Sequence, residues 1–206
     1  MAVIIERMAK LIEFETLGSF EKKVGHMHRA VWMVGGCFIS MMLMVTGSAH
    51  RAYAQLPGWF ETSPHLVGEA RFRLFFFDIY HAAFFTPDGR YDGRAPYALK
   101  LSYLRDVSSQ TITETSLDEM RRQGVNDAAR LAEWAGWMEQ NFPDMQNGDE
   151  AVIVALADGG LAFYHNQIKR GQTDDPAFTK AFFAIWLSDN ALKPDLGRRL
   201  RGIGAE

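Results

Sequence analysis

Cysteine is nearly absent from this chain, because Cys37 is the only one in 206 residues. An intrachain disulfide is therefore excluded, and the fold must rest on the burial of apolar side chains. The sequence also lacks G-x-S-x-G, H-E-x-x-H and C-x-x-C motifs and a glycine-rich phosphate loop, which excludes the enzyme classes that these signatures define. His65, His81 and His165 show no metal-ligand spacing, so we expect neither a metal nor a cofactor.

An excess of positive charge is missing as well. The chain has 22 Lys and Arg against 25 Asp and Glu, a net charge of -3, so we predict no nucleic-acid partner. Hydrophobic residues make up 48% and charged residues 23%, which is an ordinary globular balance. The length suggests one domain, or one domain preceded by a leader.

Residues 1–54 differ from the rest and read as that leader. An unbroken apolar run, AVWMVGGCFISMMLMVTG, covers 30–47, and Arg29 flanks it on the N-terminal side. Ala52 and Ala54 form the small-x-small pattern of a signal-peptidase site, so cleavage is expected before Gln55.

The start of translation and the fate of this leader can be predicted as well. Translation from Met27 rather than Met1 would leave a compact signal peptide. The predicted product is a periplasmic domain of residues 55–206. The alternative is an uncleaved N-terminal anchor, since a run of about 18 residues is near the lower limit for crossing a bilayer.

The mature chain is predicted to contain strands and helices in blocks. Strands are expected at 68–75, 78–86 and 97–104, and a hairpin at 150–166 turns at Asp158-Gly159-Gly160. Helices are expected at 116–123, from Asn126 to Phe142, from Pro176 after the cap Asp175, and from Pro194. Phe182 and Trp186 lie on the apolar stripe of the third helix and are predicted to be core rather than ligand contacts. The order favours an α+β fold in which helices cover one side of an antiparallel sheet.

The segment GEARFRLFFFDIYHAAFF, 68–85, places two arginines at the start of an aromatic hairpin. A two-residue loop at Phe76 and Phe77 would divide the side chains between two faces, because they alternate along a strand. One face, the core, would carry Ala70, Phe72, Leu74, Ile79, Ala83 and Phe85; the other would carry Arg71, Arg73, Phe75, Asp78, Tyr80 and Phe84. The second face suits an apolar ligand with one anionic oxygen.

A plainer interpretation of the two arginines stays open. Arg71 would pair with Glu69 or Asp78 on a solvated face, since surface ion pairs are common. A slip of one residue in the pairing would also exchange the two faces.

The mature chain resembles the chalcone isomerase-like family, in its bacterial exported branch. The resemblance rests on LVGEARFRLFFFDIYHAAFFTPDG, YALKLSYLRDVS, FPDMQNGD, FYHNQ and FTKAFFAIWLSDNALKPDLGRRLRG, which follow in this order over residues 66–202. It implies an open-faced β-sandwich, a large antiparallel sheet covered by helices. Ala70 stands where relatives usually have a glycine.

The resemblance also implies a site. Plant isomerases close a chalcone to a flavanone with an arginine that stabilises anionic oxygen, and fatty-acid-binding relatives hold a carboxylate with this arginine and a tyrosine on the next strand. The arginine position matches Arg71, or alternatively Arg73, and the tyrosine position matches Tyr80, with Tyr103 as a further candidate.

Two functions follow from this resemblance. The first is a non-catalytic exported protein that binds a fatty acid or a similar small apolar anion, and the alternative is a chalcone-type isomerase, an intramolecular lyase. A third interpretation is contact with an envelope protein through the apolar face. The basic residues of RRLR, 198–201, are expected to offset a helix dipole, and the alternative is a membrane-surface patch.

Overall fold

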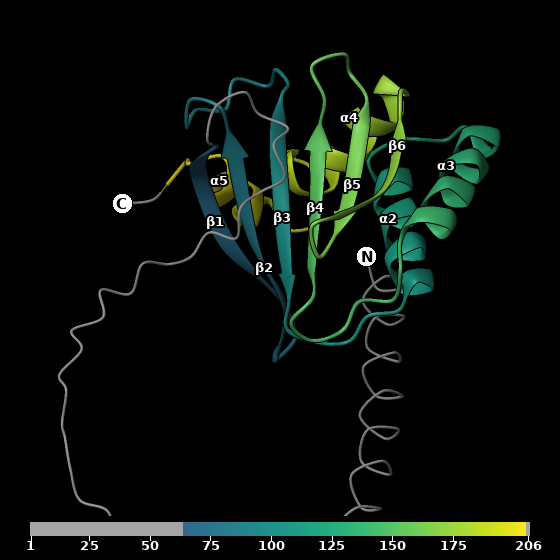
Figure 1. Ribbon diagram of the computed structural model, residues 1–206, viewed down its shortest axis with the longest axis horizontal. Coiled ribbons are helices and arrows are strands. Elements are labelled where there is room, and N and C mark those ends of the chain that lie inside the picture. The colour runs from purple at the N-terminus through teal and green to yellow at the C-terminus, as the bar shows by residue number, and fades with distance from the viewer. Residues whose placement is uncertain (1–63, 205–206) are drawn as a thin grey trace, which may run out of the picture.

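Six strands form one antiparallel sheet in which every strand pairs with its neighbours in sequence (Figure 1). The structure is a computed structural model that describes residues 64–204. The strands are β1 (His65–Leu74), β2 (Phe77–Thr86), β3 (Tyr97–Tyr103), β4 (Glu150–Ala155), β5 (Leu161–His165) and β6 (Ile168–Thr173). The predicted antiparallel sheet is confirmed, and β6 is a strand that the sequence pattern did not predict.

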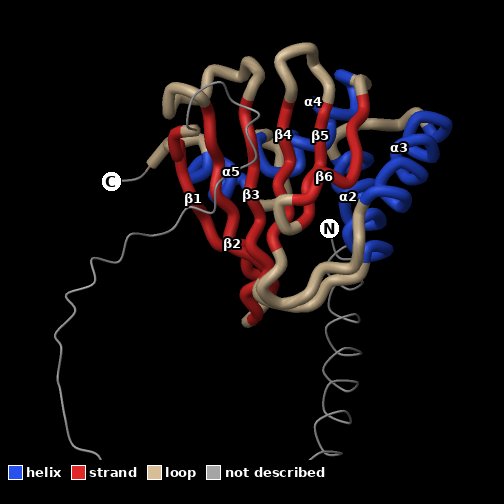
Figure 2. The backbone as a smooth tube through the Cα atoms, viewed as in Figure 1, coloured by secondary structure: helices blue, strands red, loops and turns tan. Residues whose placement is uncertain are grey.

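Four helices in the described chain pack together behind the sheet and beside it (Figure 2). They are α2 (Ser109–Arg122), α3 (Ala128–Asn141), α4 (Pro176–Leu187) and α5 (Pro194–Leu200). Helix α5 packs on β1 and β2, α4 packs on β5, and α2 lies against both α3 and α4. The fold is therefore α+β, with helices over one face of an open antiparallel sheet.

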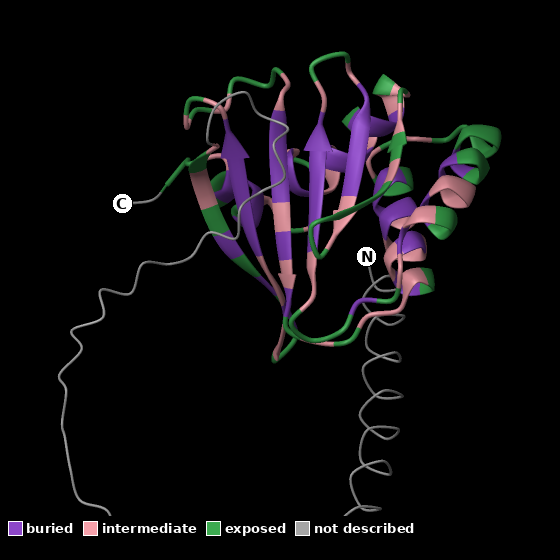
Figure 3. Cartoon of the chain, in the orientation of Figure 1, coloured by how far each residue is buried: buried purple, intermediate pink, exposed green. Residues whose placement is uncertain are grey.

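Burial is concentrated between the sheet and the helices (Figure 3). Tyr97, Leu99, Leu101 and Tyr103 all join this core, as their alternation along β3 predicts. A smaller buried cluster of Ala98, Val152, Val154 and Ala162 comes from the alternate residues of β3, β4 and β5. The central strands are therefore apolar on both faces.

Helix starts follow from capping side chains. Asp175 accepts hydrogen bonds from the backbone N–H groups of Ala177 and Phe178, and Asp127 accepts one from Arg130 at the start of α3. The first helix was predicted from Ser116, but α2 begins seven residues earlier, where Ser108 accepts a hydrogen bond from the N–H of Thr111. Ser116 instead lies inside α2, where its hydroxyl donates to the Ile112 carbonyl.

The β1–β2 hairpin differs from its predicted register. Leu74 pairs with Phe77, so the loop is Phe75–Phe76 rather than Phe76–Phe77. A register shift follows between Phe72 and Arg73, where β2 contains one extra residue. Phe72 consequently pairs with Tyr80, and both side chains face the core.

A close approach of α5 to β1 depends on Gly68. A Cβ atom at this position would lie 2.0 Å from the carbonyl oxygen of Arg199 and 2.8 Å from that of Leu200. Any side chain here would push the end of α5 away from the sheet. Gly68 was expected to mark the start of the strand, whereas it lies inside β1 beside a register shift.

The predicted leader, residues 1–54, and the predicted mature N-terminus at Gln55 lie outside the described residues. Between residues 64 and 204, no helix combines the length and the apolar character needed to cross a bilayer.

Candidate ligand cavity

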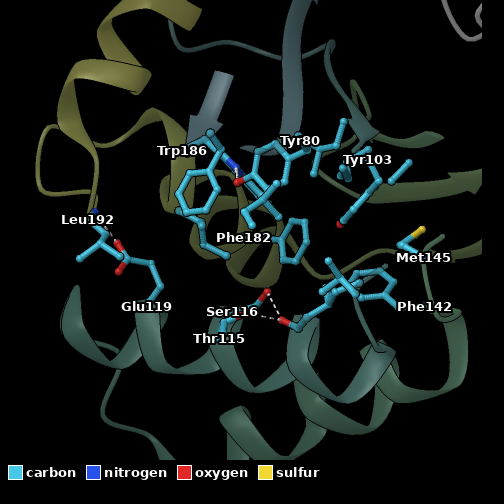
Figure 4. Close-up of a pocket in the computed structure, with 18 of the residues that line it drawn as sticks. Tyr80, Tyr103, Thr115, Ser116, Glu119, Phe142, Met145, Phe182, Trp186 and Leu192 are labelled. Carbon is cyan, nitrogen blue, oxygen red and sulfur yellow. Dashed lines mark hydrogen bonds between the residues drawn. The ribbon is translucent and has the colours of Figure 1, made fainter. Parts of the chain in front are cut away.

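An apolar cavity of about 110 Å³ lies between the inner face of the sheet and helices α2 and α4 (Figure 4). Residues of the strands, of α2, α4 and α5 and of the connecting segments form its wall. The lining residues are Phe72, Ile79, Tyr80, Leu101, Tyr103, Val107, Ile112, Thr115, Ser116, Glu119, Phe142, Met145, Ala151, Ile153, Phe163, Phe182, Ile185, Trp186, Leu192, Lys193 and Leu196. Apolar cavities of about 150 Å³ hold a benzene-sized molecule, so this smaller one has room for a short chain as it stands.

Tyr80 supplies the first polar group of the cavity. Its ring stacks on Phe72 with centroids 4.9 Å apart, and its hydroxyl accepts a hydrogen bond of 2.9 Å from Trp186 Nε1 on α4. Because the hydroxyl acts as acceptor there, its own proton remains available to another acceptor. Burial raises the pKa of Tyr80 well above its usual value, and the Trp186 bond only partly opposes this rise.

Tyr103, at the end of β3, supplies the second polar group. Its ring centroid lies 5.8 Å from that of Tyr80, and its side chain reaches into the cavity (Figure 4). Burial also raises the pKa of Tyr103 far above its usual value. Both phenols therefore stay protonated and uncharged at neutral pH, as hydrogen-bond donors in an apolar wall.

Glu119 on α2 is a buried carboxylate at one side of the cavity, and its oxygens are fully engaged. They accept hydrogen bonds from Arg122 Nε at 2.7 Å, from Gln123 Nε2 at 2.8 Å and from the Leu192 N–H at 3.0 Å. The last bond ties α2 to the loop between α4 and α5 (Figure 4). Glu119 therefore positions this loop rather than serving as a free base.

The remaining polar lining is weak. Thr115 and Ser116 both donate their hydroxyls to backbone carbonyls of their own helix. Lys193 is exposed and stands at the edge of the cavity beside Leu192. Among the described lining residues it is the only cation, so no fixed positive charge lies beside the two phenols.

Arg71 and Arg73 lie on the outer face of β1, away from the cavity. Arg71 Nη1 donates to Asp78 Oδ2 at 2.9 Å, and Arg73 Nε donates to Asp78 Oδ1 at 2.8 Å. The hydrogen bond from Arg73 lowers the pKa of Asp78, with a smaller contribution from Arg71. The plainer interpretation of the two arginines, an ion pair on a solvated face, therefore describes this side of the hairpin.

The predicted grouping of Arg71, Arg73 and Tyr80 on one face is thus wrong in its geometry. The shifted register turns Tyr80 inward and leaves both arginines outside. Of the four candidates, the structure brings together Tyr80 and Tyr103 only. Phe75 and Phe84, expected beside the ligand, do not line the cavity either.

Phe182 and Trp186 are buried, as predicted, but they also line the cavity. The predicted burial is therefore confirmed, but the prediction that these two side chains lie away from the site is wrong. One signal could have pointed to Trp186, since a buried indole N–H needs an acceptor, and few acceptors face the apolar stripe of α4. Glu119 and Lys193 were also missed, because their neighbours across the cavity are distant in sequence.

An open antiparallel sheet covered by helices, with an apolar cavity between the layers, defines the class of this protein. The description "Chalcone isomerase-like" matches residues 64–202, and the chain belongs to this family. No curated protein sequence is detectably similar to it. A fatty-acid binding protein of Arabidopsis thaliana shares the fold with a TM-score of 0.55 and 8% identity, over 71% of this chain and 90% of that one.

Proposed function

We propose that this protein is a non-catalytic binding protein for a fatty acid or a similar small amphiphile. The observation that carries the proposal is an apolar cavity into which two protonated phenols, Tyr80 and Tyr103, project. Apolar walls with a few converging polar groups are typical of small-molecule sites. The solved relative named as a fatty-acid binding protein supports the same ligand class.

The phenols replace the arginines as the expected polar end of the site. Each can donate one hydrogen bond to the same ligand oxygen, because their rings are neighbours. An ionised carboxylate would lose its hydration here without gaining a cation, which costs several kcal/mol. The lining therefore favours an uncharged carbonyl or an un-ionised acid over the anion that the sequence predicted.

The alternative, a chalcone-type isomerase, receives less support. That chemistry develops negative charge on oxygen, and a nearby cation would stabilise it. Among the described residues, Lys193 at the edge is the only cation of the lining, and Glu119 already binds several donors. Incubation with a chalcone, followed by its absorbance, tests this alternative, and turnover would overturn the non-catalytic assignment.

The binding experiment is a titration of the protein with octanoic acid and with its methyl ester. We expect both to bind, and the ester to bind at least as tightly at pH 7. Tyr103→Phe should weaken both by about threefold to tenfold, the effect of one neutral hydrogen bond. Arg71→Ala and Arg73→Ala are the matched controls and should change affinity less than twofold. Failure of every acid and ester to bind would refute the proposal.

Chain length offers a second measurement on the same site. Each added methylene should raise affinity about fourfold, from roughly 0.8 kcal/mol per buried CH₂. The gain should stop once the cavity is full, because further carbons remain in water. A series from butanoic to hexadecanoic acid locates that length, and an affinity that does not depend on chain length would show that the cavity is not the site.

Export to the periplasm belongs to the same proposal and rests on the sequence of residues 1–54. N-terminal sequencing of the protein from its own host should give Gln55 as the first residue. A product that retains the apolar run and stays with the membrane would support the uncleaved anchor instead.

A further inference from the structure

The loop of the β1–β2 hairpin exposes two aromatic side chains at the far end of the sheet. Phe76 is 94% exposed and Phe75 is 56% exposed. The hairpin projects past the neighbouring strands, and its end is coloured as exposed in Figure 3. Leu104, also exposed, lies close by, because its N–H donates to the Ile79 carbonyl. Adjacent large apolar side chains in water are unusual for a loop of a soluble domain.

These aromatics are also poorly suited to the turn they make. Phe75 has a φ of 52°, in the left-handed region that bulky residues rarely adopt. A two-residue hairpin loop with a positive φ at its first residue favours glycine at that position. The loop thus carries residues that are unfavourable both for its backbone and for its contact with water. Such a local conflict is expected where a surface serves a function.

Cations surround the base of this loop. Arg71 and Arg73 are 57% and 61% exposed and share one partner, Asp78. The guanidinium of Arg105 lies 4.2 Å from the ring centre of Phe77, the residue that follows the loop. The carboxylate of Asp106 accepts a hydrogen bond from the N–H of Asn147, in the segment that precedes β4. The hairpin therefore presents an apolar end with three arginines at its base, of which Arg71 and Arg73 share the carboxylate of Asp78.

We propose that Phe75 and Phe76 insert into the surface of an anionic lipid bilayer while Arg71, Arg73 and Arg105 face its headgroups. Aromatic side chains enter the boundary between headgroups and acyl chains, and nearby arginines are attracted to anionic lipid. Docking in this orientation would bring the cavity close to the bilayer, since Ile79, which soon follows the loop, and Tyr103, which pairs with Tyr80, both line it. The inference does not depend on which ligand the cavity holds.

The experiment uses the expected mature chain, residues 55–206, which contains no cysteine, with one new cysteine that carries an environment-sensitive fluorophore. Leu104→Cys places the label beside the hairpin, and Ile203→Cys places it at the opposite end of β1, where Gly202 approaches Val67. Ile203 is 53% exposed and follows the basic residues Arg198 to Arg201, so it is a stringent control. Phosphatidylglycerol vesicles should raise the emission at position 104 severalfold and leave that at 203 unchanged.

Changes in the loop test its role without harming the fold. Phe75→Gly with Phe76→Asn should keep or raise the melting temperature, because glycine suits the positive φ of the first loop residue. The same change should weaken the vesicle response at position 104 at least tenfold. Arg73→Gln and Arg105→Gln should each weaken it about threefold to fivefold, and phosphatidylcholine vesicles should give little response.

Three outcomes would overturn the proposal. Equal changes in emission at positions 104 and 203 would show that the hairpin is not the part of the protein that contacts the bilayer. A response that survives the Phe75→Gly and Phe76→Asn loop would show that the phenylalanines are not inserted. A rise in emission with protein concentration, in the absence of vesicles, would show that the loop packs against a second copy of the chain instead.

Discussion

The two faces of the β1–β2 hairpin carry opposite chemistry, although they come from neighbouring residues of the same two strands. The inner face holds Phe72, Tyr80 and Phe84, all packed in the core. The outer face near the loop holds Arg71 and Arg73, paired with Asp78 and mostly exposed. One face forms a wall of the cavity, and the other is solvated.

The difference shows that pairing, rather than alternation alone, assigns a side chain to a face. Alternation correctly separates Phe72 from Arg71 and Arg73 on β1. On β2, the extra residue at the register shift allows both Ile79 and Tyr80 to line the cavity. An irregularity of one residue therefore decides whether the arginines share a site with the tyrosine.

The largest contrast between buried and exposed parts of the hairpin is expected for two phenylalanines. Phe84→Ala should lower the free energy of unfolding by about 3–5 kcal/mol, because Phe84 is fully buried on β2. Phe76→Ala, at 94% exposure, should change it by no more than about 0.5 kcal/mol. Chemical denaturation measures both, and similar losses would contradict the observed register.

Alkaline pH should affect the inner face next. Burial raises the pKa values of Tyr80, Tyr97 and Tyr103, so the folded state keeps them protonated where the unfolded state ionises. Their contribution is fully present below the unfolded pKa of about 10 and is lost as pH rises toward the folded values. Each of these tyrosines should then lower the free energy of unfolding by about 1.4 kcal/mol for every pH unit above 10.

Tyr103→Phe provides the control for this slope. It removes one titrating group and should make the decline with pH shallower by one tyrosine's share. The measurement is denaturant unfolding at several pH values above 9. A slope that is identical in wild type and variant would mean that Tyr103 ionises equally well in the folded state.

Most of the fold was predictable from the sequence, because it depends on local patterns. The alternation at 97–103, the cap at Asp175 and the turn at Gly159 each predict an element that the structure contains. The start of α2 was missed because Ser116 fits a capping pattern that also occurs inside a helix. Strand β6 was missed because IKRGQT is polar and its residues are exposed or half-buried, so it has no apolar stripe.

The site was only partly predictable. Tyr80 and Tyr103 were identified as candidates, and both line the cavity. The arginines were placed beside Tyr80 because the sequence does not reveal the extra residue of β2 at the register shift. The change of loop position from 76–77 to 75–76 would by itself have left them on one face. Trp186 is 106 residues from its partner Tyr80, and such a contact depends on how α4 packs on the sheet.

Loss of one hydroxyl on the inner face should have a smaller effect than loss of a ring. Tyr80→Phe leaves the indole N–H of Trp186 without its acceptor in a buried place, which should cost about 1–3 kcal/mol. Tyr103→Phe removes a hydroxyl for which no hydrogen bond is found among residues 64–204, so stability should change less. Thermal unfolding measures the stability of both variants. An equal loss of stability in the two would mean that the hydrogen bond from Trp186 does not account for the effect of Tyr80→Phe.

The smallest effect is expected on the outer face. Asp78→Asn removes the partner of two arginines and leaves their charges side by side, so stability at pH 7 and low salt should fall slightly. The pKa of Asp78 is lowered in the folded state, so its contribution is present above the ordinary aspartate pKa and is lost as pH falls through the folded value. The difference in stability between variant and wild type should therefore shrink as the pH falls below about 4. It should also disappear in about 1 M salt at pH 7, where exposed charges are screened. A difference that persists in both conditions would show that Asp78 contributes through packing, and the outer face would then resemble the inner one more than its exposure indicates.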